Sequence, residues 1–94
     1  MTGAVWISQA NNSYYRIAEL ILPNFGSTGL RRFDFKTTFL PHAAGRILVK
    51  SQGLERNTEM NANQPIEFES GVEGEIANAT NEEIRFTVAE FKSI

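Results

Sequence analysis

Apolar and polar side chains alternate along several short segments of this chain. In EIRFTVAEF, Ile84, Phe86 and Val88 fall on one side of an extended strand, while Arg85 and Thr87 fall on the other. A period of two residues is typical of a strand with one buried and one wetter face. The segment is therefore predicted to be a strand that places its three apolar side chains in a core.

The same period occurs in two earlier segments. In PIEFES it turns Ile66 and Phe68 inward, and Pro65 fits as the first residue of the strand, where its missing N–H costs no ladder bond. In GRILVKS it turns Ile47 and Val49 inward. Both segments are predicted to be core strands.

The stretch RRFDFKTTF alternates cations with phenylalanines, so it is either a core strand or a nucleic-acid surface. A surface that binds single strands needs its rings and cations on the same side. Alternation instead separates them, which favours a core strand. The two sets are Phe33, Phe35, Thr37 and Phe39 on one side, and Arg32, Asp34, Lys36 and Thr38 on the other. A nucleic-acid-binding barrel stays a minor alternative, with Arg31, Arg32 and Lys36 as its phosphate contacts.

The segment YYRIAELIL fits a strand or a short helix capped by Ser13, and its β surroundings favour the strand. Turn residues separate short apolar runs along the whole chain, which is typical of a sandwich or barrel. We therefore predict one domain, residues 1–94, folded as an all-β antiparallel sandwich, jelly-roll-like or immunoglobulin-like, of seven or eight short strands. The expected strands are roughly 4–9, 14–22, 30–40, 45–51, 54–60, 65–70, 74–79 and 83–92.

Composition adds a few bounds. Hydrophobic residues make up 41% of the chain, with seven Phe and no Cys, so a packed core is expected without disulfides. Neither a signal peptide nor an apolar run of ~20 residues is visible, so we expect synthesis in the cytoplasm and no membrane insertion. The net charge is -2, but residues 1–56 carry +4 (seven Lys/Arg, three Asp/Glu) and residues 57–94 carry -6 (two against eight). This asymmetry favours ion pairs between neighbouring strands, or alternatively the stacking of copies.

Catalytic chemistry has little support. His42 is the single histidine and lies in a turn-like segment, LPHAAG. A Ser-His-Asp arrangement would need a serine, His42 and Asp34, the single aspartate, to meet in a geometry that the sequence does not show. One His and no Cys argue against a transition-metal site, and the acidic group is better explained as a solvated face than as a calcium site. We predict no enzyme, no metal and no cofactor. The acidic group is Glu67, Glu69, Glu73 and Glu75.

A polar-aromatic cluster near the N-terminus is the remaining candidate site. Its members are Trp6, Asn11, Asn12, Tyr14 and Tyr15. Such residues can bind a glycan, with rings against sugar C–H groups and amides on hydroxyls, but Trp and Tyr are also common at protein interfaces. A third interpretation places Trp6 in the core. A carbohydrate-binding, lectin-like module is therefore an alternative function.

The order YYRIAEL, a Gly-containing turn, FDFKTTF and GRILVKS resembles the small β-sandwich domains of bacteriophage virion proteins, of the tail-fibre head or capsid decoration type. The resemblance covers residues 14–51. It implies a virion component, often trimeric, that binds a host glycan or its own capsid. The predicted function is thus a non-enzymatic structural protein that assembles with itself, as a homo-oligomer, or with a larger protein shell.

Overall fold

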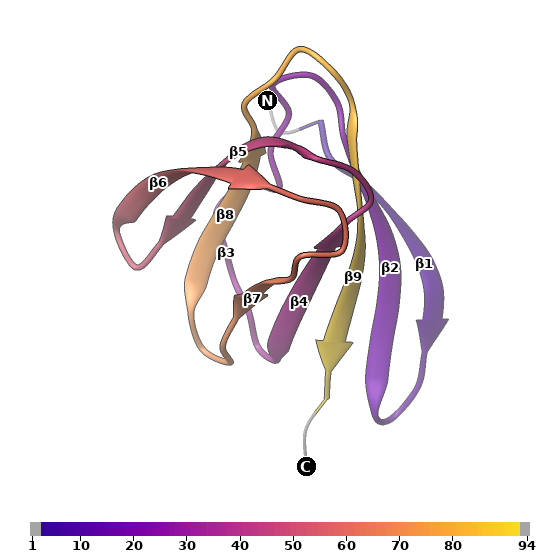
Figure 1. The fold of residues 1–94 in the computed structure, drawn as a ribbon. Helices are drawn as coiled ribbons and strands as arrows, with labels where there is room; N and C mark the ends of the chain where they lie inside the picture. The colour runs from indigo at the N-terminus through magenta and orange to yellow at the C-terminus, as the bar shows by residue number, and fades with distance from the viewer. Residues whose placement is uncertain (1–2, 93–94) are drawn as a thin grey trace.

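The protein is an antiparallel β-sandwich of two sheets, seen in a computed structural model that describes residues 3–92 (Figure 1). This confirms the predicted fold class. No helix within the described range is long and apolar enough to span a bilayer. One sheet has the order β1-β2-β9-β4-β7 and the other the order β3-β8-β5-β6. The strands of this range are β1 (Val5–Asn11), β2 (Tyr15–Leu22), β3 (Arg31–Arg32), β4 (Lys36–Pro41), β5 (Gly45–Ser51), β6 (Leu54–Met60), β7 (Ile66–Phe68), β8 (Glu73–Asn78) and β9 (Ile84–Phe91).

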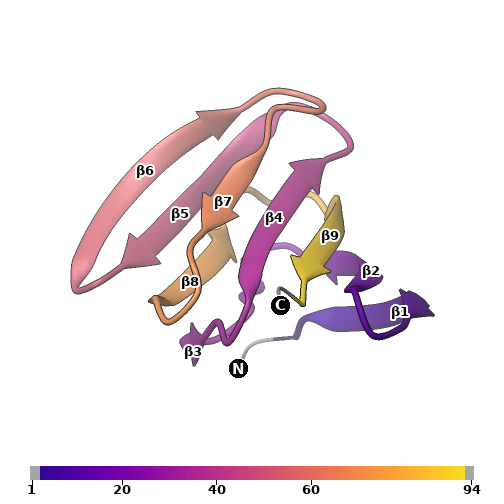
Figure 2. The ribbon, with the colours of Figure 1, turned by 90° about the horizontal axis from the view of Figure 1, so that it is seen from below.

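The last strand lies inside the larger sheet. β9 runs between β2 and β4, as Figures 1 and 2 show, with Tyr15 opposite Phe91 and Leu22 opposite Ile84. Because β2 pairs with β1 on one side and β9 on the other, its backbone donors and acceptors are used in ladders. This pairing confirms that the ambiguous segment YYRIAELIL is a strand.

The expected strand 30–40 is wrong as a single element. Its first residues form β3, which pairs with β8, while the rest form β4, which pairs with β7 and β9 in the other sheet. Between them, Phe33 N donates to Val72 O at 2.9 Å and Gly71 N donates to Phe33 O at 2.7 Å. These bonds hold the chain where it crosses between the sheets. The prediction that the phenylalanines of this segment face inward is nevertheless confirmed, since Phe33 and Phe39 are buried and Phe35 is half-buried.

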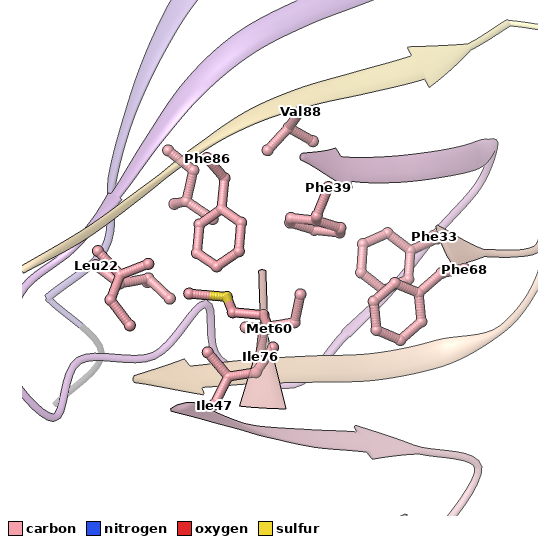
Figure 3. Packing of buried hydrophobic residues seen from close by; sticks show 11 residues of the cluster. Leu22, Phe33, Phe39, Ile47, Met60, Phe68, Ile76, Phe86 and Val88 are labelled. Atoms are coloured by element: carbon pink, nitrogen blue, oxygen red, sulfur yellow. The ribbon is translucent and has the colours of Figure 1, made fainter. Parts of the chain in front are cut away.

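Aromatic rings fill the space between the sheets (Figure 3). Phe33 stacks on Phe68 with 4.6 Å between ring centroids, and Phe39 meets Phe68 and Phe86 edge-on at 5.7 and 6.0 Å. Such geometries stabilise a core by ~0.5–1.5 kcal/mol per pair beyond area burial. The Phe68 ring lies against Gly74 of β8, where an added Cβ would be 2.5 Å from Phe68 Cε1. The glycine thus makes room for the ring.

The basic and acidic halves of the chain form ion pairs with each other, as predicted. Arg46 Nη2 is 3.5 Å from Glu59 Oε1, and Lys50 Nζ is 3.7 Å from Glu75 Oε1. The Arg46–Glu59 pair is exposed on both sides, so it adds at most ~1 kcal/mol to stability. The asymmetry along the sequence therefore cancels largely across strands.

One buried amide joins three segments at the end of the sandwich where β2 and β8 stop. The side chain of Asn78 is 2% exposed. Its Nδ2 donates to Leu22 O at 3.2 Å, Pro23 O at 3.0 Å and Glu82 O at 2.6 Å, and its Oδ1 accepts from Thr80 N at 2.9 Å. This side chain fixes the start of the turn into β9 against the end of β2.

Candidate functional site

The two sheets have open edges at β1 and β3, and two side chains bridge them. Trp6 lies opposite the buried Leu20, and Arg31 lies opposite the buried Gly74, so both side chains are on the inner faces of their sheets. The Cζ atom of Arg31 is 4.7 Å from the centroid of the Trp6 ring. This is a cation–π contact, and it bridges one open side of the sandwich.

An ion pair lies in the next rows of the larger sheet. Arg16 on β2 and Glu90 on β9 are register partners, so their side chains share the inner face. Arg16 Nη2 is 2.6 Å from Glu90 Oε1 and 2.8 Å from Oε2, and Nε is 3.2 Å from Oε1. The guanidinium of Arg16 and the carboxylate of Glu90 therefore form a bidentate ion pair.

Two adjoining hollows of about 90 and 230 Å³ lie at these four side chains. Both are lined by Trp6, Arg16, Arg31 and Glu90; we call this the β1–β3 groove. Drug-sized ligands occupy pockets of ~300–1,000 Å³. The groove is thus sized for a molecule of few heavy atoms.

Arg31 differs from Arg16 in its charged surroundings. Among the residues that the structure describes, no carboxylate lies within salt-bridge distance of Arg31. Arginine stays protonated at any working pH. The β1–β3 groove therefore combines an uncompensated positive charge with the face of an aromatic ring.

The polar-aromatic cluster predicted from the sequence is not assembled as one surface. Trp6 is on the inner side and 37% exposed, neither wholly core nor wholly surface, while Tyr15 is on the outer face of the same sheet. Asn12 serves the turn, because its Oδ1 accepts from Tyr14 N at 2.8 Å and Tyr15 N at 3.0 Å. Asn11 ends β1. Of this cluster, Trp6 alone lines the groove.

The basic residues considered for nucleic acid are also separated. Arg31 points inward, whereas Arg32 pairs with Glu73 in the β3–β8 ladder and takes the opposite face. Lys36 Nζ is 4.0 Å from Glu67 Oε2. The three cations form no single stripe. Two groove residues, Arg16 and Glu90, were missed by sequence reasoning, because only the pairing of β2 with β9 brings them together.

The donor set does not fit a metal centre. Within residues 3–92, no three His, Cys, Asp or Glu side chains converge as metal ligands would. The single imidazole, His42, has its Nε2 2.8 Å from Thr87 Oγ1, on the outer face of the larger sheet. Its bond is to a hydroxyl and not to Asp34, so no Ser-His-Asp arrangement is formed there.

No protein-family model and no curated protein match the sequence. Solved structures do match the fold. A cupin domain from Bordetella pertussis Tohama I has a TM-score of 0.88 at 23% identity, over 97% of this chain and 95% of that one. An RmlC-like cupin with a double-stranded β-helix fold from Methanocaldococcus jannaschii has 0.81 at 12%, over 97% and 82%. A predicted oxalate decarboxylase from Thermotoga maritima has 0.72 at 18%, over 97% and 85%.

These neighbours correct the function expected from the sequence. The resemblance to bacteriophage virion domains is wrong, because the matched structures are consistently cupin domains. The virion assembly function is therefore wrong as well. The lectin-like and nucleic-acid alternatives each require one surface that carries all their residues, and the structure places those residues on different faces. At these identities the likeness establishes the fold: this chain folds as the double-stranded β-helix of cupin domains.

Proposed function

We propose that this cupin-fold domain binds a small organic carboxylate in the β1–β3 groove. The observation that carries the proposal is the guanidinium of Arg31, stacked on Trp6 and without a carboxylate partner among the described residues. A free cation beside an aromatic face suits a ligand that is charged at one end and apolar at the other.

The stacking prepares Arg31 for such a ligand. Contact at 4.7 Å with the Trp6 ring restricts the guanidinium. The N–H groups of a guanidinium point outward in its own plane, where they match the two oxygens of a carboxylate. Because the side chain is already held, less conformational entropy is lost when the ligand binds.

The neighbouring ion pair of Arg16 and Glu90 determines which charge a ligand of the groove should carry. The Glu90 carboxylate is bonded three times by Arg16, so it satisfies Arg16 and leaves Arg31 uncompensated. A monoanion that reaches Arg31 is then attracted, while its apolar part can lie against Trp6. The volume of 230 Å³ limits that apolar part to a short chain or one ring.

We propose that the groove binds the carboxylate and does not convert it chemically. The T. maritima neighbour is a predicted oxalate decarboxylase, which acts on a small carboxylate and supports the ligand class. In this chain, however, the imidazole that most often serves as general acid or base lies on the outer face. The groove supplies groups that hold an anion.

The proposal is tested through Trp6, the single tryptophan of the chain. Titration with propionate, butyrate or benzoate, monoanions with an apolar end of increasing size, at constant ionic strength set with chloride, should change its fluorescence in a saturable way for at least one of the three. The Arg31→Gln variant should bind that carboxylate ~10-fold or more weakly, because a charge-assisted bidentate contact is lost.

Arg46→Gln is the matched control. Arg46 is also an exposed arginine, but it lies on the outer face and pairs with Glu59 at 3.5 Å. This variant should bind like the wild type. Equal loss in both variants, or no saturable signal with any of the three carboxylates, would refute the proposal.

A further inference from the structure

The larger hollow of the β1–β3 groove carries a net positive charge. Among the residues that the structure describes, the charged side chains that line this hollow of about 230 Å³ are those of Arg16, Arg31 and Glu90. The two arginines contribute +2 and the glutamate -1, which leaves +1. A hollow with this balance attracts an anion of one charge, because a second negative charge on the ligand meets no further cation.

The surroundings of Glu90 explain why its charge is paired with Arg16. The side chain of Glu90 is 19% exposed and that of Arg16 is 44% exposed, so the carboxylate is the more enclosed of the two. On the other side of β9, Thr37 of β4 lies opposite Glu90, but its Oγ1 donates to Phe35 O at 2.9 Å. An enclosed carboxylate needs a cation or other donors. Arg16 supplies them through contacts of 2.6, 2.8 and 3.2 Å.

We propose that Glu90 makes the groove select monocarboxylates over dicarboxylates, and that Arg16 is a positioning residue that keeps Glu90 from pairing with Arg31. This inference rests on the function proposed above. The first carboxylate of a dicarboxylate can pair with Arg31, but its second one meets the Glu90 carboxylate in the same hollow. Like charges in contact disfavour binding, and a contact of this kind is a common way to reject a wrong ligand.

Removing the charge of Glu90 is expected to reverse the preference. Glutamine has nearly the same shape as glutamate, and its side-chain oxygen can still accept from Arg16. In Glu90→Gln, Arg16 therefore keeps a hydrogen-bond partner while its charge is no longer balanced. The hollow then holds two cations, Arg16 and Arg31, and a dicarboxylate can pair with both of them.

Removing Arg16 is expected to have the opposite effect. In Arg16→Gln, the enclosed carboxylate of Glu90 has lost its cation, and Arg31 lines the same hollow. Glu90 then competes with the ligand for Arg31, and it has the advantage of a high effective concentration because both belong to one protein. Arg16→Gln should therefore bind monocarboxylates weakly, although Arg31 itself is unchanged.

A double variant separates positioning from a general loss of structure. In the protein that carries both Arg16→Gln and Glu90→Gln, Arg31 no longer faces a competing carboxylate, and the charge of the hollow is again +1. Monocarboxylate binding should return close to that of the wild type. If Arg16 only stabilised the sheet, the double variant would lack the whole ion pair and would bind at least as weakly as Arg16→Gln.

Fluorescence titration of Trp6 with matched ligands measures the specificity. Each monocarboxylate is compared with a dicarboxylate built on the same chain or ring: malonate with propionate, succinate with butyrate and phthalate with benzoate. The titrations are made at neutral pH and constant ionic strength, because salt screens charge contacts. For the monocarboxylate that binds most tightly, the wild type should prefer it to its partner by ~10-fold or more, and Glu90→Gln should prefer the dicarboxylate. Arg16→Gln should bind the monocarboxylate ~10-fold or more weakly than the wild type.

Glu59→Gln is the matched control for Glu90→Gln. It removes the same charge from the outer face of the other sheet, where Glu59 pairs with Arg46 at 3.5 Å. This variant should keep the wild-type preference. An equal shift in both glutamine variants would overturn the inference, because the net charge of the protein would then account for it.

The same titrations distinguish a failure of this inference from a failure of the proposed function. If none of the three monocarboxylates binds the wild type, the proposed function is refuted and the inference with it. If one of them binds through Arg31 but Glu90→Gln keeps the wild-type preference, the inference alone is overturned. Far-ultraviolet circular dichroism shows whether each variant is folded, and Glu90→Gln alone decides if Arg16→Gln is not.

Discussion

Phe39→Ala is expected to lower the free energy of unfolding by about 4 kcal/mol, in the range found for large core truncations. Phe39 is fully buried and its ring meets those of Phe33, Phe68 and Phe86 edge-on. Removing it leaves a cavity on which four strands border, and strands in ladders cannot easily move to fill it. Urea denaturation followed by far-ultraviolet circular dichroism measures the loss. Tryptophan fluorescence is less suitable as the probe, because the ring of Trp6 contacts that of Phe39 and its signal would change with the substitution itself.

Phe25→Ala is the matched control for this prediction. Phe25 is 67% exposed and has a φ of 56°. Its truncation removes the same atoms from a surface position, so it should change stability by less than ~0.5 kcal/mol. A similar cost at both positions would contradict the assignment of Phe39 to the core.

Asn78→Ala is expected to destabilise by about 3 kcal/mol, from several hydrogen bonds of ~1 kcal/mol each to a buried amide. The Nδ2 group meets three backbone carbonyls, those of Leu22, Pro23 and Glu82. Without the amide, these carbonyls lose the donor that they share, and the end of β2 is no longer bonded to the turn that precedes β9. The midpoint of thermal unfolding should fall by ~10 °C or more for a domain of this size.

Two further substitutions separate the causes at this position. Asn78→Asp keeps the acceptor for Thr80 N and Thr80 Oγ1 but brings a carboxylate against the three carbonyls, so it should cost at least as much as alanine. Asn81→Ala, at an exposed asparagine of the same turn, should cost little. Indifference to Asn78→Asp would show that the amide donor contributes nothing.

Periodicity predicted most strands because a half-buried sheet imposes it directly. Ile84, Phe86 and Val88 are all buried, as their alternation indicated. It failed between Phe33 and Phe35, because alternation of side chains continues through a point where the chain leaves one sheet for the other. Which backbone groups a residue bonds is decided by distant segments, and a local pattern does not contain that information.

The groove was only partly predictable for the same reason. Trp6 was noticed for its chemistry, but it was grouped with residues adjacent in sequence. Its real neighbours are Arg16, Arg31 and Glu90, which come from three other strands. The buried amide of Asn78 was likewise not predicted, because nothing in its local sequence shows that it is buried. Sites built by pairing of remote strands require the pairing to be known first.

The position of β9 between β2 and β4 has a consequence for synthesis. A ribosome delivers β1, β2, β4 and β7 before Ile84 to Phe91, so until then the larger sheet is two separate pieces with bare inner edges. Such edges can pair with those of another nascent chain. The time during which this protein is vulnerable to misassembly therefore extends until its ninth strand emerges.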